Sequence, residues 1–309
     1  MSIIQWYPGH IAKLERKLGD LLKLCDVVIE VLDARIPLAT TNPRIRARYP
    51  NKPLLLLINK ATLADPTQTK QWLKHVQAHH GHTAPVLVID HDAVSKLHHQ
   101  QVIQAIATLA ETSLKALEAK GLKRRPARAI IVGMPNVGKS TVLNSMVGRK
   151  KTQTGHKAGV TRQPQWVRIH PKIELLDTPG IIPPQLGSED IGIKLACVSS
   201  VGEASFEEEP VAQYLLDLMQ SVYPGVLQKH YGLLAAEATA PLAEAAPSLA
   251  AISLARQWLA KGGGPDIHRT ARHVLSDFRQ GRWGRHTLEW VTGTVSASES
   301  VHPVEPLSV

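Results

Sequence analysis

The stretch AIIVGMPNVGKST, residues 129–141, decides the fold because it joins an apolar run to a glycine-bounded loop and then to a helical pattern. Gly133 and Gly138 let backbone N–H groups turn inward around phosphate oxygens, and Lys139 adds a positive charge. The Ser140 hydroxyl is placed to hold Mg²⁺, and the start of the following helix favours an anion. The sequence therefore predicts a phosphate-binding loop, with cofactor-binding candidates Asn136, Val137, Gly138, Lys139, Ser140 and Thr141.

A second motif lies downstream, where the apolar residues 173–176 lead into Asp177-Thr-Pro-Gly180. A carboxylate at the end of a strand suits the water shell of Mg²⁺, and the Gly180 N–H can reach a γ-phosphate. Between the motifs, GVTR (residues 159–162) offers Thr161 as a hydroxyl that closes over Mg²⁺ in the triphosphate state. The two motifs indicate a P-loop NTPase. Its Mg²⁺ candidates are Ser140, Thr161 and Asp177, and its candidates at the reacting phosphate are Lys139, Thr161 and Gly180.

A third motif stands upstream of both, where the apolar run 54–58 ends in Asn59-Lys60-Ala61-Thr62. Many GTPases grip guanine with Asn-Lys-x-Asp after a buried strand, the Asn bonding toward the base and the Lys lying along the ring. Here Thr62 replaces the Asp, so the charged acceptor is missing. The residues around Asp90, in VIDHD (88–92), stand where such GTPases have a second base contact, a Ser-Ala-Lys-like motif, and they do not match it. Both base-recognition motifs are therefore weakened, while the phosphate motifs are intact.

Strands and helices alternate through the first two thirds of the chain, which favours an α/β fold with a mostly parallel sheet and helices on both faces. We expect strands over 27–35, 54–58, 85–89, 129–132, 165–170 and 173–176, and helices over 11–24, 66–77, 97–118 and 139–147. Beyond about residue 205 only helical patterns remain, over 211–222, 227–234, 248–261 and 266–280. A nucleotide-binding domain over 1–204 and a small all-α domain over 205–309 are therefore expected.

Composition restricts the partners. The 309 residues carry a net charge of +10, and the stretch 145–173 contains seven Lys or Arg and no acidic residue. A long single-sign segment favours a polyanion such as nucleic acid. Cys25 and Cys197 are too isolated to suggest a disulfide. No membrane span or signal peptide is evident, so a cytoplasmic protein is expected.

The motifs taken together resemble a known family, the ribosome biogenesis GTPase A family. The resemblance is carried by YPGHIAK (7–13), DARIPLATTNP (33–43), the phosphate loop, DTPG, and GGGPDIHRTARHVLSDFRQGRWGRHTLE (262–289). It implies a P-loop fold with the GTPase motifs in circularly permuted order. It also implies a cytoplasmic GTPase that uses GTP and Mg²⁺ and helps to assemble the large ribosomal subunit by binding ribosomal RNA.

The resemblance also bears on hydrolysis. Ile181 and Ile182 follow Gly180 where a water-orienting Gln stands in Ras-like GTPases, and an apolar side chain cannot orient water. The family shares this substitution, and its candidate replacement is the His of PGH, here His10, which would position a water. The alternative is that His10 only caps the first helix. In related GTPases an Asn at the position of Asn136 marks potassium-assisted hydrolysis. The alternative is that Asn136 is a neutral loop residue.

The C-terminal helical region carries the expected RNA contact. Its candidates are Arg269, Arg272, Arg279, Arg282 and Arg285 with Trp283 and His286 among them, and the basic segment 149–172 is a second candidate. The alternative is a solvated helix face with a core Trp. The rival function is an RNA-binding assembly factor with relaxed nucleotide specificity or lost GTP hydrolysis. An ATPase gains little support.

Overall fold

The computed structural model describes residues 19–42, 50–79, 83–147, 165–178, 188–233 and 247–291. These residues form two compact units. An α/β unit contains the described residues from 19 to 178 and, again, residues 287–291. A helical unit contains those from 188 to 286. The boundary expected from the sequence lay between 204 and 205, whereas the helical unit already includes residues 188–204.

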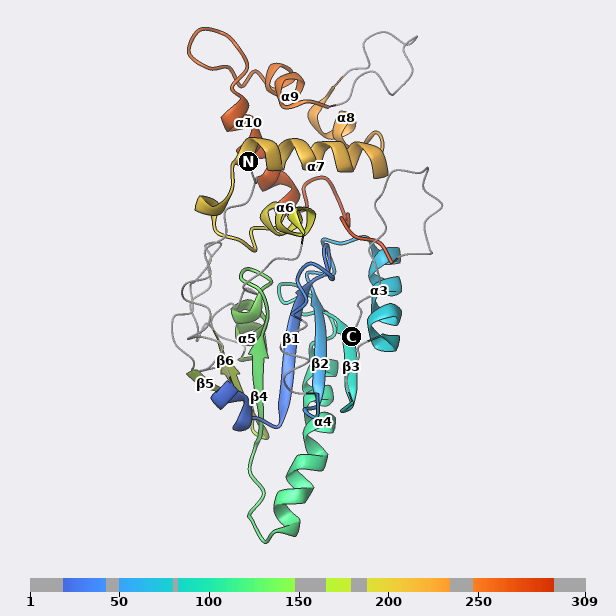
Figure 1. Ribbon diagram of the computed structural model, residues 1–309, viewed down its shortest axis with the longest axis vertical. Coiled ribbons are helices and arrows are strands. Elements are labelled where there is room, and N and C mark those ends of the chain that lie inside the picture. The colour runs from blue at the N-terminus through green and yellow to red at the C-terminus, as the bar shows by residue number, and fades with distance from the viewer. Residues whose placement is uncertain are drawn as a thin grey trace. The chain divides into compact units, whose positions relative to one another are not determined.

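The α/β unit is built on one six-stranded sheet in the order β3-β2-β1-β4-β6-β5 (Figure 1). The strands are β1 (Val27–Asp33), β2 (Leu54–Asn59), β3 (Val86–Asp90), β4 (Ala127–Val132), β5 (Gln165–His170) and β6 (Ile173–Asp177). All pairs are parallel except β5 with β6, which are antiparallel. β1 and β2 are buried along their whole length, which explains why Val, Ile and Leu dominate both strands.

The order of the strands fixes where a ligand can bind. The chain runs from β1 outward to β2 and β3, and then crosses back to β4 on the other side of β1. Loops after neighbouring parallel strands that leave in opposite directions open a crevice at the carboxyl ends of the strands. The loops after β2 and β4 are the Asn59 loop and the phosphate loop, so both flank β1 at the same edge.

Helices described in the α/β unit pack on this sheet. They are α3 (Pro66–Ala78) against β3, α4 (His99–Ala119) against β1 to β4, and α5 (Lys139–Val147) against β5 and β6. α3 begins where Asp65 accepts the backbone N–H groups of Thr67 and Gln68, with Pro66 at its first turn. A carboxylate cap and an early proline are the usual signals for a helix start.

The helical unit contains α6 (Glu189–Cys197), α7 (Glu208–Val222), α8 (Val226–Tyr231), α9 (Leu249–Ala255) and α10 (Ile267–Arg279). α6 was not anticipated, and it packs against α7 and α10. The helix expected over 248–261 was too long, since α9 ends at Ala255 and Gln257 then takes a positive φ of 55°. Cys25 and Cys197 are both buried thiols. Among the described residues, no helix has the length and apolar character needed to cross a membrane.

Residues 287–291, the return segment, pack on the α/β unit after the helical unit has ended. The Leu288 N–H donates to the Arg35 carbonyl at 2.8 Å. The Glu289 carboxylate accepts the backbone N–H groups of Leu38 and Ala39 at 2.7 and 3.0 Å. Two further bonds run from the Asp65 N–H to Thr287 Oγ1 and from Trp72 Nε1–H to the Glu289 carbonyl.

Candidate nucleotide-binding site

The phosphate loop takes a shape that only glycine permits at its two ends. Gly133 has φ +147°, and a Cβ there would stand 2.5 Å from the Val31 carbonyl oxygen. Gly138 has φ +101°, and its Cβ would stand 2.4 Å from Asn59 Nδ2. Both approaches are closer than any real Cβ contact, so the sequence pattern reflects contact with β1 and with the Asn59 loop as well as backbone freedom.

Lys139 lies buried at the start of α5. Its ammonium donates to the carbonyls of Gly133 and Met134 at 3.1 and 2.8 Å, inside the curl of the loop. Burial lowers the pKa of Lys139 to about 8, although the nearby Asp177 carboxylate acts in the opposite direction. A polyphosphate would supply the negative charge that this buried ammonium lacks.

Ser140 and Asp177 bring hydroxyl and carboxylate oxygens together. The Ser140 Oγ lies 3.4 Å from Asp177 Oδ2, and Asp177 is fully buried at the end of β6. The next residue, Thr178, donates its hydroxyl to the Ile131 carbonyl at 2.6 Å and so ties this strand end to β4. Oxygen ligands of this kind suit Mg²⁺, so the residues present fit the expected ion.

Asn59 connects three loops. Its side chain is buried, and Nδ2 donates to the Val137 carbonyl of the phosphate loop at 2.8 Å. Its Oδ1 accepts from His91 Nδ1 at 3.0 Å and from the Ala93 N–H at 3.3 Å. Burial lowers the pKa of His91 to about 4, so the ring is neutral and its Nδ1 carries the proton that Asn59 accepts. The amide therefore connects the phosphate loop with the loop after β3.

Lys60 belongs to a buried ionic cluster that the sequence did not reveal. Its ammonium donates to Asp33 Oδ2 at 2.9 Å and to the Asn136 carbonyl at 2.6 Å. Asp33 also accepts the Arg35 guanidinium through both oxygens, at 2.9 and 2.8 Å. Burial alone would raise the pKa of Asp33, but Arg35 and Lys60 hold it well below its usual range. Lys60 thus links the end of β1 to the phosphate loop.

Thr62 is exposed, and its hydroxyl donates to Asp92 Oδ2. The other oxygen of Asp92 accepts the N–H groups of Val94 and Ser95 at 3.0 and 2.8 Å. Asp92 was not singled out from the sequence. Asp90, which was, lies at the end of β3 and pairs with His98 instead. His10, Thr161 and Gly180 lie outside the described residues.

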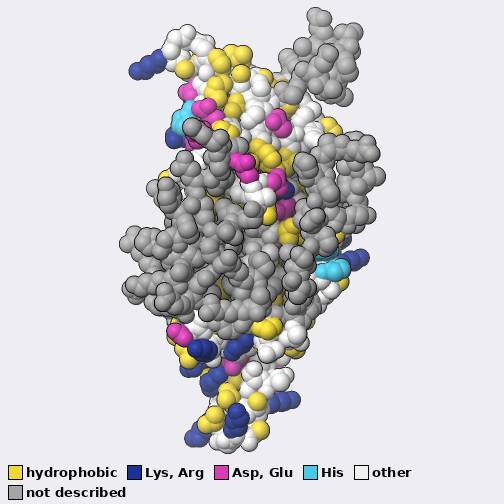
Figure 2. All heavy atoms as spheres, in the orientation of Figure 1, with side chains coloured by type: hydrophobic (Ala, Val, Ile, Leu, Met, Phe, Trp, Pro, Cys, Tyr) yellow, Lys and Arg dark blue, Asp and Glu magenta, His cyan; other side chains and the backbone are white. Residues whose placement is uncertain are grey.

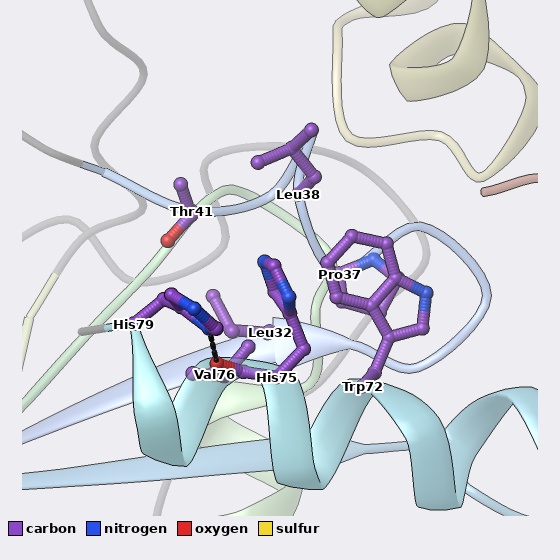
Figure 3. A pocket seen from close by; sticks show the side chains of 8 residues that line it. All are labelled: Leu32, Pro37, Leu38, Thr41, Trp72, His75, Val76 and His79. Atoms are coloured by element: carbon purple, nitrogen blue, oxygen red, sulfur yellow. Dashed lines mark hydrogen bonds between the residues drawn. The ribbon is translucent and has the colours of Figure 1, made fainter. Parts of the chain in front are cut away.

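A small cavity of about 20 Å³ lies beside β1 and α3 and is separate from these loops (Figure 3). It has room for about one water molecule. His75 and His79 stack beside it at 4.7 Å, and burial lowers the pKa of His75. Its lining is Leu32, Pro37, Leu38, Thr41, Trp72, His75, Val76 and His79. This cavity is a gap in packing rather than a nucleotide pocket.

The basic residues of the helical unit are partly committed to the fold. Arg279 donates to the carbonyls of Ala196 and Cys197, and Arg282 pairs with Asp277 at 2.8 Å. Trp283 is buried with its indole N–H on the Tyr231 hydroxyl, which is the core-tryptophan alternative. The sequence did not reveal a more accessible aromatic group, Trp258 stacked on His273 at 4.3 Å with Arg269 at 5.8 Å from the Trp258 ring.

A second basic region lies in the α/β unit. Figure 2 shows Lys and Arg side chains gathered over the connection between α4 and β4. The connection contains Arg124, which pairs with Glu111 at 2.6 Å, and Arg125, which pairs with Asp26 at 2.7 Å. The local charge of this connection is therefore partly balanced by acidic neighbours.

The sheet, the glycine-bounded loop, and the Asn-Lys loop that precedes it in the chain define a P-loop GTPase with circularly permuted motifs. A family model described as 50S ribosome-binding GTPase matches residues 128–218. Ribosome biogenesis GTPase A of Priestia megaterium is 38% identical, covering 93% of this chain and 96% of that protein. The Bacillus pumilus protein of the same name is 36% identical, covering 93% and 98%. GNP-bound YlqF from T. maritima aligns with a TM-score of 0.59 at 27% identity, covering 90% and 98%. The chain belongs to the ribosome biogenesis GTPase A family and is a GTP hydrolase acting in ribosome assembly.

Proposed function

We propose that this GTPase binds ribosomal RNA on the precursor of the large ribosomal subunit, in the cytoplasm, and hydrolyses GTP slowly until it is bound there. The observation that supports nucleotide binding in this proposal is a pair of hydrogen bonds between the phosphate loop and the loop after β2 that carries Asn59, here called the base loop. Asn59 bonds to the carbonyl of Val137, and Lys60 bonds to that of Asn136. Occupation of the base site and of the phosphate site is therefore coupled through two side chains.

The residues of the site bind different parts of the nucleotide and its Mg²⁺ ion. Lys139 exchanges the two loop carbonyls for β- and γ-phosphate oxygens, which offsets the cost of its burial. Ser140, Thr161 and Asp177 would hold Mg²⁺, which neutralises the charge that develops on the phosphates. The N–H of Gly180 would contact the γ-phosphate. Lys60 keeps the loop closed while these contacts form.

The attacking water is assigned to His10, with a potassium ion held near Asn136. The support for His10 is chemical, since Ile181 and Ile182 leave no polar side chain after Gly180. His10→Ala should reduce turnover with little change in GTP affinity, because only the transition state is affected. Replacing potassium by sodium should slow the wild type, and Asn136→Ala should abolish the difference between the two salts.

The rate on the ribosome is the decisive measurement. We expect GTP turnover to rise when precursors of the large subunit are added, and to stay low with small-subunit particles. Unchanged turnover with large-subunit particles would contradict the role as an assembly switch. If GTP, ATP and XTP bind equally well, the rival function of an RNA-binding factor with relaxed nucleotide specificity replaces it.

The RNA contact is assigned to the exposed end of the α9–α10 region, where Trp258, His273 and Arg269 lie together. Aromatic rings stack on unpaired bases and arginine contacts phosphate. Trp258→Ala and Arg269→Ala should weaken binding to large-subunit particles, and the arginine change should also reduce the slope of affinity against salt. Arg124→Ala, which removes the same charge from the α/β unit, is the matched control.

A further inference from the structure

The base loop of this chain lacks its usual carboxylate, yet a carboxylate stands beside the gap. Position 62 carries a hydroxyl, and that hydroxyl donates to Asp92 Oδ2. Asp92 lies thirty positions further along the chain, just after β3, and is only 5% exposed. A hydroxyl and a carboxylate are therefore in contact at the place where the guanine edge is expected to bind.

The backbone fixes Asp92 in this place. The His91 N–H donates to the Ile58 carbonyl at 2.8 Å, and the Ala61 N–H donates to the His91 carbonyl at 3.0 Å. These bonds continue the pairing of β2 with β3 beyond the sheet, so the base loop and the loop after β3 keep one register. Asn59 adds a third tie through its bond from the Ala93 N–H.

We propose that Asp92 is the residue that recognises guanine in this protein, taking over the acceptor role that position 62 has lost. The proposal rests on the proposed function, since it presumes that GTP is the nucleotide bound. Guanine presents two donors on one edge, the N1–H and the N2 amine. Adenine presents a lone pair at N1, which a carboxylate repels. Thr62 then acts as a positioning residue that holds the carboxylate toward the base.

The carboxylate has capacity for this role. Oδ1 accepts two backbone N–H groups, Oδ2 accepts the Thr62 hydroxyl, and the Ser95 hydroxyl also bonds to this carboxylate. A carboxylate has about four acceptor positions, and the Thr62 and Ser95 hydroxyls can rotate to other acceptors, which leaves positions for donors from guanine. Burial opposes ionisation of Asp92, but the bonds from Ser95 and Thr62 hold its pKa below the usual value. The group is therefore an anion at neutral pH.

The charge of Asp92 also acts on Lys60. Among the charges that act on the Lys60 ammonium, Asp92 is one that favours its charged form. Lys60 is the side chain expected along the guanine ring. One residue for the face of the base and one for its edge thus lie within electrostatic reach of each other, which is what recognition of a flat ring requires.

The competing explanation is that Asp92 only caps the turn at Val94 and Ser95. Asp92→Asn separates the two roles because an amide keeps the Oδ1 acceptor for both N–H groups while removing the charge. The amide also presents N–H donors, which suit the C2 carbonyl of xanthine and repel the guanine amine. Asp90→Asn is the matched control, because it removes a carboxylate two residues away that pairs with His98.

The test is equilibrium binding of GTP, XTP and ATP to the full-length wild type and variants. The wild type should prefer GTP. Asp92→Asn should weaken GTP binding by ~10- to 100-fold, the value of one charge-assisted hydrogen bond, and improve XTP binding. Asp90→Asn should leave all three affinities within about twofold. Thr62→Asp alone should not strengthen GTP binding, since two carboxylates would then be adjacent. The double variant Thr62→Asp with Asp92→Ser should bind GTP about as well as the wild type, because one carboxylate is again present.

The outcomes are distinguishable. Wild-type GTP affinity in Asp92→Asn, or a clear gain from Thr62→Asp alone, overturns the role of Asp92 while the GTPase assignment stands. A wild type that binds none of the three nucleotides contradicts the proposed function itself. If Asp92→Asn melts early, the double exchange decides: failure to recover GTP preference in a folded double variant overturns the proposal.

Discussion

Replacing Asp33 by Asn should destabilise the α/β unit more than any surface change of the same kind. Asp33 is fully buried and accepts one Lys60 and two Arg35 bonds of 2.8–2.9 Å. The amide keeps the shape but removes the anion that the buried Arg35 and the partly buried Lys60 contact. Removing one partner of a buried ion pair costs ~3–5 kcal/mol, so we expect a loss of this size at pH 7. Urea unfolding followed by circular dichroism measures it.

The pH dependence provides a second reading of the same variant. The pKa of Asp33 is depressed in the folded state, so its contribution is complete above the unfolded pKa of 3.8 and is lost as the pH falls below it. At pH 3 the unfolded chain is mostly protonated at this site. The difference in the free energy of unfolding between the wild type and Asp33→Asn should therefore be smaller than at pH 7 by about 1.2 kcal/mol. Asp20→Asn, which breaks an exposed pair with Lys23, is the control and should change little. A gap that is small at pH 7, or that widens toward pH 3, would refute the buried-cluster argument.

Three further outcomes are expected. GTP affinity should fall about fourfold between pH 7 and pH 8.5, because the pKa of Lys139 is about 8 without phosphates and rises when they bind; titration calorimetry measures this, and an affinity that is flat over this range would contradict it. Asn59→Ala should weaken GTP binding by at least about tenfold, because Val137, His91 and Ala93 each lose a partner; a fluorescent GTP analogue reports it, and near wild-type affinity would show that the brace is dispensable. Glu289→Gln should lower the free energy of unfolding by ~1–3 kcal/mol through weaker bonds to Leu38 and Ala39; an unchanged urea midpoint would show that the return segment contributes nothing.

The parts of the fold that the sequence predicted are those with strong local signals. Buried parallel strands show as apolar runs, and the helix after the phosphate loop begins and ends at Lys139 and Val147 as expected. α6 escaped because its nine residues, with Gly192 in the middle, are too short for a clear period. The helix over 248–261 was overextended because its apolar pattern continues past the turn at Gln257.

The site was predicted unevenly for a related reason. Glycines and Lys139 are recognisable within one short window, so the phosphate loop needs no tertiary information. Asp33 contacts Lys60, and Asp92 contacts Thr62. The members of each pair are distant in the sequence, and the pairing of β1, β2 and β3 brings them together. Thr62 could be recognised as a departure from the sequence, but its partner could not.

The position of β1 explains why the permuted order leaves a working site. Its carboxyl end lies between the base loop after β2 and the phosphate loop after β4. Asp33 at that end holds Lys60, which reaches the phosphate loop, and Arg35, whose carbonyl receives the return segment through Leu288. These contacts depend on which strands are neighbours and not on the order in which the chain makes them. Because β1 precedes β2 and β4 in the chain, its carboxyl end comes before the base loop, the phosphate loop and the return segment that contact it.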